Sequence, residues 1–149
     1  MTDIDITRLR VLVIDDEAFM RTLVVRVLNE LGITQVTAAE DGADALERLS
    51  TTARNFELII CDLEMPNMDG FAFVRELRSQ PGDTESGLSP CADIPVLILT
   101  GHSEEDVVHD ALGLGIHGYL VKPISRGALE ARIQIAMTSP PIDPMKLKR

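Results

Sequence analysis

The chain is poor in aromatic residues and in cysteine. Only 3% of its 149 residues are aromatic, whereas 45% are hydrophobic, so the core must consist mainly of aliphatic side chains. Cys61 and Cys91 are too few for a disulfide framework, and neither belongs to a metal-binding Cys-x-x-Cys pair. A chain of this length is long enough for one ordinary domain with a real core.

Long apolar runs and an excess of basic residues are also absent. No apolar run approaches the roughly 20 residues that a membrane-spanning helix needs. The first ten residues, "MTDIDITRLR", lack the pattern of a secretory signal. We therefore expect a cytoplasmic protein without membrane insertion. The net charge of −10 argues against direct binding of nucleic acid, which requires a basic face.

Five short apolar segments alternate with five segments of helical periodicity. The predicted strands are residues 10–15, 35–38, 57–62, 95–100 and 118–121. The first predicted helix ends at Gly32, and the others span residues 41–49, 69–78, 103–112 and 125–136, the last with Ser125 as N-cap. This alternation predicts an α/β fold with a parallel sheet covered on both faces. We expect a doubly wound, flavodoxin-like sheet of five strands in the order 2-1-3-4-5.

One domain is expected over residues 10–137. Residues 1–9 form an N-terminal extension, and residues 138–149 a proline-containing tail that we expect to be mobile. The connection at residues 79–93 is unusually long, and we place it at the sheet edge away from the carboxyl ends of the strands.

Polar residues stand at the carboxyl ends of four predicted strands. Asp15 and Asp16 follow the first strand, Asp62 ends the third, Thr100 ends the fourth, and Lys122 follows the fifth. Each has an ordinary explanation taken singly, such as a helix cap or a solvated lysine. Because ligands of open parallel sheets bind beyond these ends, however, their shared position predicts one site.

The chemistry of such a cluster is restricted. Carboxylates held close together repel one another unless a cation neutralises them, and a set of oxygen ligands suits Mg²⁺. A carboxylate can also attack phosphorus and form an aspartyl-phosphate. A lysine and a hydroxyl would then bind the phosphoryl oxygens, since positioning and electrostatics dominate this chemistry.

Four motifs, "VLVIDDE", "LIICDLEMPNMDG", "PVLILTG" and "GYLVKP", occur in this order over residues 10–136. Together they resemble the receiver domain of bacterial two-component response regulators, of the single-domain type found in chemotaxis. The resemblance implies that Asp62 is the phosphoacceptor. It also implies a Mg²⁺ site made by Asp16, Asp62 and the main-chain carbonyl of Glu64, with Asp15 acting largely through metal-bound water.

The same resemblance implies roles for residues of the last two strands. Thr100 is expected to be the switch hydroxyl and Tyr119 the switch aromatic side chain. Lys122 is expected to bind the phosphoryl group, and its peptide bond to Pro123 is usually cis in this family.

The resulting hypothesis is a phosphorylation-dependent switch rather than an enzyme, although it assists its own phosphorylation and dephosphorylation. A histidine kinase or histidine phosphotransfer protein would donate the phosphoryl group. An unknown protein would dock on the face made by the fourth helix, fifth strand and fifth helix. Two alternatives are a fragment of a larger regulator that lacks its output domain, and a phosphohydrolase with an aspartate nucleophile, of which Asp62-Leu63-Glu64 is a weak echo.

Two expectations concern other side chains. The first helix should be the docking surface for the phosphodonor, with Phe19 or Met20 exposed for that purpose, unless both pack in the core. The three histidines, His102, His109 and His117, show no metal-ligand spacing and are expected to be surface or loop residues.

Overall fold

A computed structural model describes residues 5–52, 56–65, 68–78, 94–101 and 116–138. Within these residues, five strands form one parallel sheet in the order β2-β1-β3-β4-β5. The predicted α/β fold and strand order are therefore confirmed. The predicted helix at 103–112, the connection at 79–93, and all but the first residue of the predicted tail lie outside the described residues, as do His102 and His109.

The elements agree with the predicted segments to within about one turn. The strands are β1 (Arg10–Ile14), β2 (Gln35–Ala39), β3 (Leu58–Asp62), β4 (Val96–Thr100) and β5 (Gly118–Val121). The described helices are α1 (Ala18–Glu30), α2 (Gly42–Thr52), α3 (Gly70–Arg78) and α5 (Arg126–Thr138), preceded by a short 3-10 helix, η1 (Ile6–Arg8). The first strand ends one residue earlier than predicted, although the Asp15 N–H still donates to the Ala39 carbonyl at 3.2 Å.

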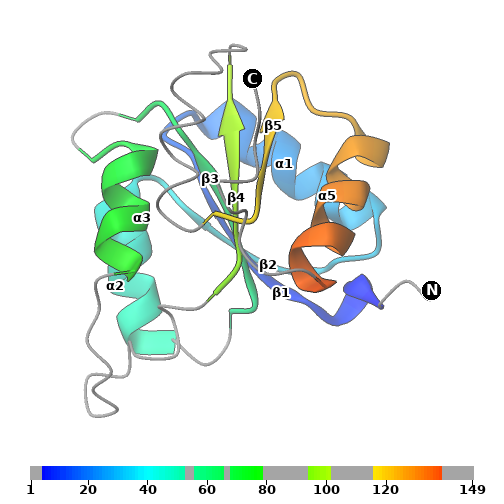
Figure 1. Cartoon of the computed structure of the whole chain (residues 1–149), viewed down its shortest axis with the longest axis horizontal. Helices are drawn as coiled ribbons and strands as arrows, with labels where there is room; N and C mark the ends of the chain where they lie inside the picture. The colour runs from blue at the N-terminus through cyan, green and yellow to red at the C-terminus, as the bar shows by residue number, and fades with distance from the viewer. Residues whose placement is uncertain (1–4, 53–55, 66–67, 79–93, 102–115, 139–149) are drawn as a thin grey trace, which may run out of the picture.

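The helices cover the sheet in two layers. Figure 1 shows α1 and α5 on one face and α2 and α3 on the other. Alternate residues of each strand therefore enter different cores, as the two-residue period of a strand requires. Leu12 and Ile14 of β1 belong to the cluster under α2 and α3, whereas Val11 and Val13 belong to the cluster under α1 and α5. The central strands β3 and β4 are buried along their whole length.

Local signals in the sequence set where the helices begin and end. After α1, Gly32 has a φ of +91°, a left-handed conformation that ends the helix and that side chains disfavour. The Ile33 N–H then donates to the Leu28 carbonyl at 3.0 Å. Before α5, the Ser125 hydroxyl accepts a hydrogen bond from the Ala128 N–H at 3.2 Å, which confirms the predicted N-cap.

The expectation for His117 was wrong in one respect. The residue lies in the loop before β5, but its side chain is buried, and its Nδ1 atom accepts a hydrogen bond from the Val96 N–H at 3.4 Å. Burial, with a smaller effect of the Arg78 charge, lowers the pKa of His117 to about 4. No periodicity marks a single loop residue as buried, so only the packed structure reveals this.

Among the described residues, no helix is long and apolar enough to cross a membrane.

Candidate functional site

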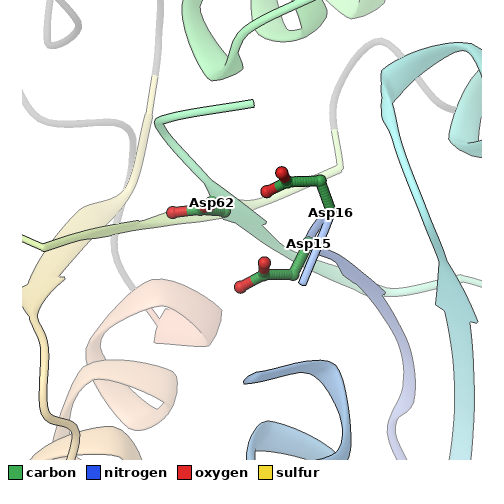
Figure 2. A group of neighbouring side chains, drawn as sticks. All are labelled: Asp15, Asp16 and Asp62. Carbon is green, nitrogen blue, oxygen red and sulfur yellow. The ribbon is translucent and has the colours of Figure 1, made fainter. Parts of the chain in front are cut away.

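Three carboxylates meet beyond the carboxyl ends of two neighbouring strands. The pairing of Ile14 with Cys61 sets β1 beside β3, so that Asp15 and Asp16 emerge next to Asp62. One carboxylate oxygen from each lies within 4.8 Å of the other two. Figure 2 shows the three side chains around one space at this edge. The structure therefore brings together the aspartates that the sequence placed at one edge of the sheet.

The three acids differ in their surroundings. Asp15 and Asp62 are 0% and 2% exposed, whereas Asp16 is open to solvent. The Asp15 Oδ1 atom accepts a hydrogen bond from the Glu17 N–H at 2.9 Å. Its buried Oδ2 atom has no hydrogen-bond partner among the described residues. The nearest cation, the Lys122 ammonium, lies 3.6 Å from this oxygen, beyond hydrogen-bond distance, so a further cation or a bound water would still lower the cost of burying it.

Burial also makes the ionised form of Asp62 less favourable. It raises the pKa of Asp62 to about 6, against the lowering effect of a hydrogen bond from Lys122. The Asp15 charge adds to the increase. Burial similarly raises the pKa of Asp15. Near neutral pH, Asp62 is therefore mostly ionised, in an environment that favours neutralisation of its charge.

Lys122, which directly follows the edge strand β5, reaches this cluster. The Lys122 Nζ atom lies 3.0 Å from Asp62 Oδ1 and 3.6 Å from Asp15 Oδ2. Burial by itself lowers the pKa of Lys122, but the hydrogen bond to Asp62 and the two carboxylate charges outweigh it, so the pKa is raised. The Lys122 N–H donates to the Thr100 carbonyl at 2.7 Å, and the bond to Pro123 is cis, as the resemblance implied. The lysine is therefore a permanent cation within the acidic cluster.

The chain beyond Asp62 turns under close steric control. A Cβ atom at Gly70 would lie 2.8 Å from the Asp62 carbonyl oxygen and 2.9 Å from Leu63 Cα. Because both neighbours are backbone atoms, only glycine fits here without a shift of the strand end. The Gly70 N–H donates to the Leu63 carbonyl at 2.9 Å, which fixes the start of α3 against that strand end.

Glu64 lies in this turn and is exposed. Its backbone donates a hydrogen bond that lowers the pKa of Asp62, although less than burial raises it. Its side-chain Oε1 lies 3.6 Å from the place where a Cβ at Gly101 would stand. Glu64 therefore reaches across the end of β4, at the border of the cluster.

Thr100 and Tyr119 lie on the same side of the sheet. Thr100 is fully buried at the end of β4, two residues beyond Ile98, so the two side chains share a face. Tyr119 packs against the cluster that contains Ile98, and the two residues are paired between β4 and β5. Thr100 is thus at the edge with the acids, and Tyr119 lies behind it on the neighbouring strand.

Sequence reasoning missed one contact of the site. The Arg21 guanidinium of α1 donates from Nη1 to the Asp15 carbonyl at 2.7 Å, which ties the loop after β1 to the helix. An arginine in the first turn of a helix ordinarily indicates a solvated residue, so no pattern predicts this bond. Phe19, one of the two residues expected to be exposed, is 77% exposed, whereas Met20 is half-buried.

Comparisons with known proteins agree with this geometry. Residues 11–134 match the family model described as "Response regulator receiver domain". The chain is 30% identical over 126 residues to "Chemotaxis protein CheY" of Pseudomonas aeruginosa, covering 85% of this chain and 94% of that protein. It is also 30% identical over 129 residues to "Chemotaxis protein CheY1" of Helicobacter pylori, covering 87% and 97%. The solved structure of Vibrio cholerae chemotaxis protein CheY4 superposes with a TM-score of 0.71 at 30% identity, covering 86% of this chain and 98% of that one.

Proposed function

Because this chain belongs to the response regulator receiver family, whose members are signalling domains, we propose that it is a phosphorylation-dependent switch with Asp62 as phosphoacceptor. The observation that carries the proposal is the 3.0 Å contact between the Lys122 ammonium and Asp62 inside a group of three carboxylates. A buried acid held between a fixed cation and other acids has the surroundings that phosphoryl transfer to a carboxylate needs.

The transfer requires one bond to form and one to break. An ionised oxygen of Asp62 attacks the phosphorus of a phosphohistidine donor, a P–O bond forms, and the imidazole leaves as the P–N bond breaks. The pKa of about 6 leaves the carboxylate mostly ionised at neutral pH. Lys122 already contacts Asp62 Oδ1 and would compensate the charge of the phosphoryl oxygens. The hydroxyl of Thr100, buried at the end of β4, would donate a hydrogen bond to one of the phosphoryl oxygens.

The donor set at this edge fits Mg²⁺. It consists of hard oxygen ligands, and the buried Asp15 Oδ2 atom lacks a hydrogen-bond partner among the described residues. Asp16, Asp62 and the Glu64 carbonyl would hold the ion directly, and Asp15 would act through bound water. The ion would neutralise the acids and the incoming phosphoryl charge.

The phosphodonor, a histidine kinase or a histidine phosphotransfer protein, would dock on α1. Phe19 is an exposed aromatic residue in the first turn of this helix, close to the acidic edge. A surface hollow of about 370 Å³ runs along α1 from Ala18 to Asn29, with Ala38 of β2 at its other side. A hollow along a helix that also carries an exposed aromatic residue is the kind of surface that a partner helix occupies.

The output would pass through Thr100 and Tyr119. When Thr100 moves toward the phosphoryl group, Tyr119 would move inward behind it and change the face made by β5, α5 and the helix predicted at 103–112. A downstream protein would read this change by docking. We place the protein in the cytoplasm, where the histidine-based donors of this signalling system act.

Intact-mass measurement after incubation with Mg²⁺ and acetyl phosphate tests the proposal. We expect a gain of one phosphoryl group that is lost in Asp62→Asn and when EDTA removes the metal. Asp69→Asn is the matched control, because Asp69 is exposed and its main contact is the N-cap bond to Ala72, which asparagine can also make. Steady release of phosphate without an adduct would favour a hydrolase. The absence of both an adduct and phosphate release would contradict the phosphoacceptor role.

A further inference from the structure

An arginine of α5 covers the proposed switch aromatic residue. The Arg132 guanidinium carbon lies 5.9 Å from the centroid of the Tyr119 ring. The arginine Cδ atom would lie 3.8 Å from a Cβ at Gly118, so the aliphatic stem passes beside the residue that precedes the tyrosine.

The two residues approach each other from opposite faces of the sheet. Tyr119 packs against the cluster under α2 and α3, whereas α5 contributes to the cluster under α1 and α5. The contact is possible because β5 is an edge strand, so that Arg132 reaches the ring around the edge. Arg132 is exposed and the ring is half-buried. The interaction is therefore a bridge between layers at the border of the molecule.

We propose that Arg132 is a positioning residue that holds the Tyr119 ring at the sheet edge and so opposes its inward movement. This inference rests on the proposed role of Tyr119 in the switch. If the ring moves inward, the guanidinium must either lose the ring or follow it out of water, and both are unfavourable. A cation–π contact at an exposed site shifts such an equilibrium by about two- to fivefold.

The composition of the chain makes this contact measurable. Tyr119 is the single tyrosine and the chain has no tryptophan, so its intrinsic fluorescence reports on this one ring. Arg132→Met keeps the aliphatic stem and removes the charge, whereas Arg132→Lys keeps a cation. Arg126→Met is the matched control, because it removes the same charge from an exposed position of the same helix.

The first readout needs no phosphorylation. A cation above the ring attracts anionic iodide, so the ratio of iodide quenching to acrylamide quenching should fall in Arg132→Met and stay unchanged in Arg126→Met. If the role of Arg132 were merely structural, its replacement would change the quenching by iodide and by acrylamide to the same extent. Equal ratios in the two variants would overturn the inference, because the cation would then not lie at the ring.

The second readout is the beryllofluoride concentration that gives half of the Tyr119 fluorescence change in excess Mg²⁺. We expect this midpoint to fall by about two- to fivefold in Arg132→Met and to stay near that of the unmodified protein in Arg132→Lys. An unchanged or higher midpoint in Arg132→Met, in a protein that still gains the phosphoryl mass, would refute the role of Arg132 alone. Absence of the phosphoryl adduct in the unmodified protein would refute the proposed function and, with it, this regulation.

Discussion

Replacement of Asp62 by asparagine should stabilise the protein, although it removes the proposed reacting group. Burial of Asp62 at 2% exposure, together with the charge of Asp15, raises its pKa from 3.8 to about 6. A shift of about 2 units corresponds to about 3 kcal/mol of disfavoured ionisation in the folded state. Asparagine has nearly the shape of the protonated acid and its oxygen can still accept from Lys122, so most of this free energy should be recovered.

The effect has a defined pH window. Because the folded-state pKa is raised, the folded protein binds more protons than the unfolded chain between pH 3.8 and about 6. The contribution of Asp62 to stability is therefore fully present below pH 3.8 and is lost as the pH rises through about 6. We expect the free energy of unfolding of Asp62→Asn to exceed that of the unmodified protein by about 2–3 kcal/mol at pH 8. Near pH 3.5 the two values should be equal as far as residue 62 is concerned.

Urea unfolding at pH 8 in the presence of EDTA measures this difference. In a thermal scan, the melting temperature should rise by about 2–4 °C for each kcal/mol gained in the free energy of unfolding, as expected for a protein of this size. Glu130→Gln on α5 removes one charge from an exposed position and controls for the net charge of −10. Excess Mg²⁺ should narrow the difference, because ligand binding stabilises the unmodified protein.

Two results would refute this reasoning. If Asp62→Asn is no more stable than Glu130→Gln at pH 8 in EDTA, the buried carboxylate carries no ionisation cost. If the gain is equally large at acidic and alkaline pH, it does not arise from the charge of Asp62.

Three further predictions test other features. Gly70→Ala should destabilise the protein by about 1–3 kcal/mol in urea unfolding, because the alanine Cβ would lie 2.8 Å from a backbone atom. Gly127→Ala, whose Cβ would have no atom within 4 Å, should be neutral or stabilising. Equal changes in the free energy of unfolding would contradict the steric argument. The imidazole of His117 should titrate in NMR spectra with a midpoint of about 4, so that its contribution to stability is lost as the pH falls from 6.5 to about 4; a midpoint near 6.5 would mean that the ring is solvated. Phe19→Ala should slow phosphoryl transfer from a histidine-containing protein and leave both unfolding and the reaction with acetyl phosphate unchanged, since the ring is 77% exposed; equal slowing with both donors would exclude a docking role.

The arrangement of the fold and the location of the site could be predicted from the sequence because both depend on local pattern. Apolar runs that alternate with helical periodicity lead to a parallel sheet, and all carboxyl ends of such a sheet point the same way. The polar residues that end the strands, from Asp15 to Lys122, must therefore share an edge. Local chemistry also explains the boundaries at Gly32 and Ser125, where a left-handed residue and a side-chain cap act within one turn.

Properties that depend on distant neighbours were decided only by the tertiary structure. Asp15 and Asp16 are adjacent and chemically identical and reach the same cluster, yet one is fully buried and the other exposed, because the surrounding elements cover only Asp15. The bond from Lys122 to Asp62 joins residues that are 60 positions apart. The burial of His117 and the cover of Arg132 over Tyr119 likewise arise where separate elements pack together. The sequence by itself determined which groups reach the site, and packing determined their charge states and contacts, because burial and distance depend on the whole fold.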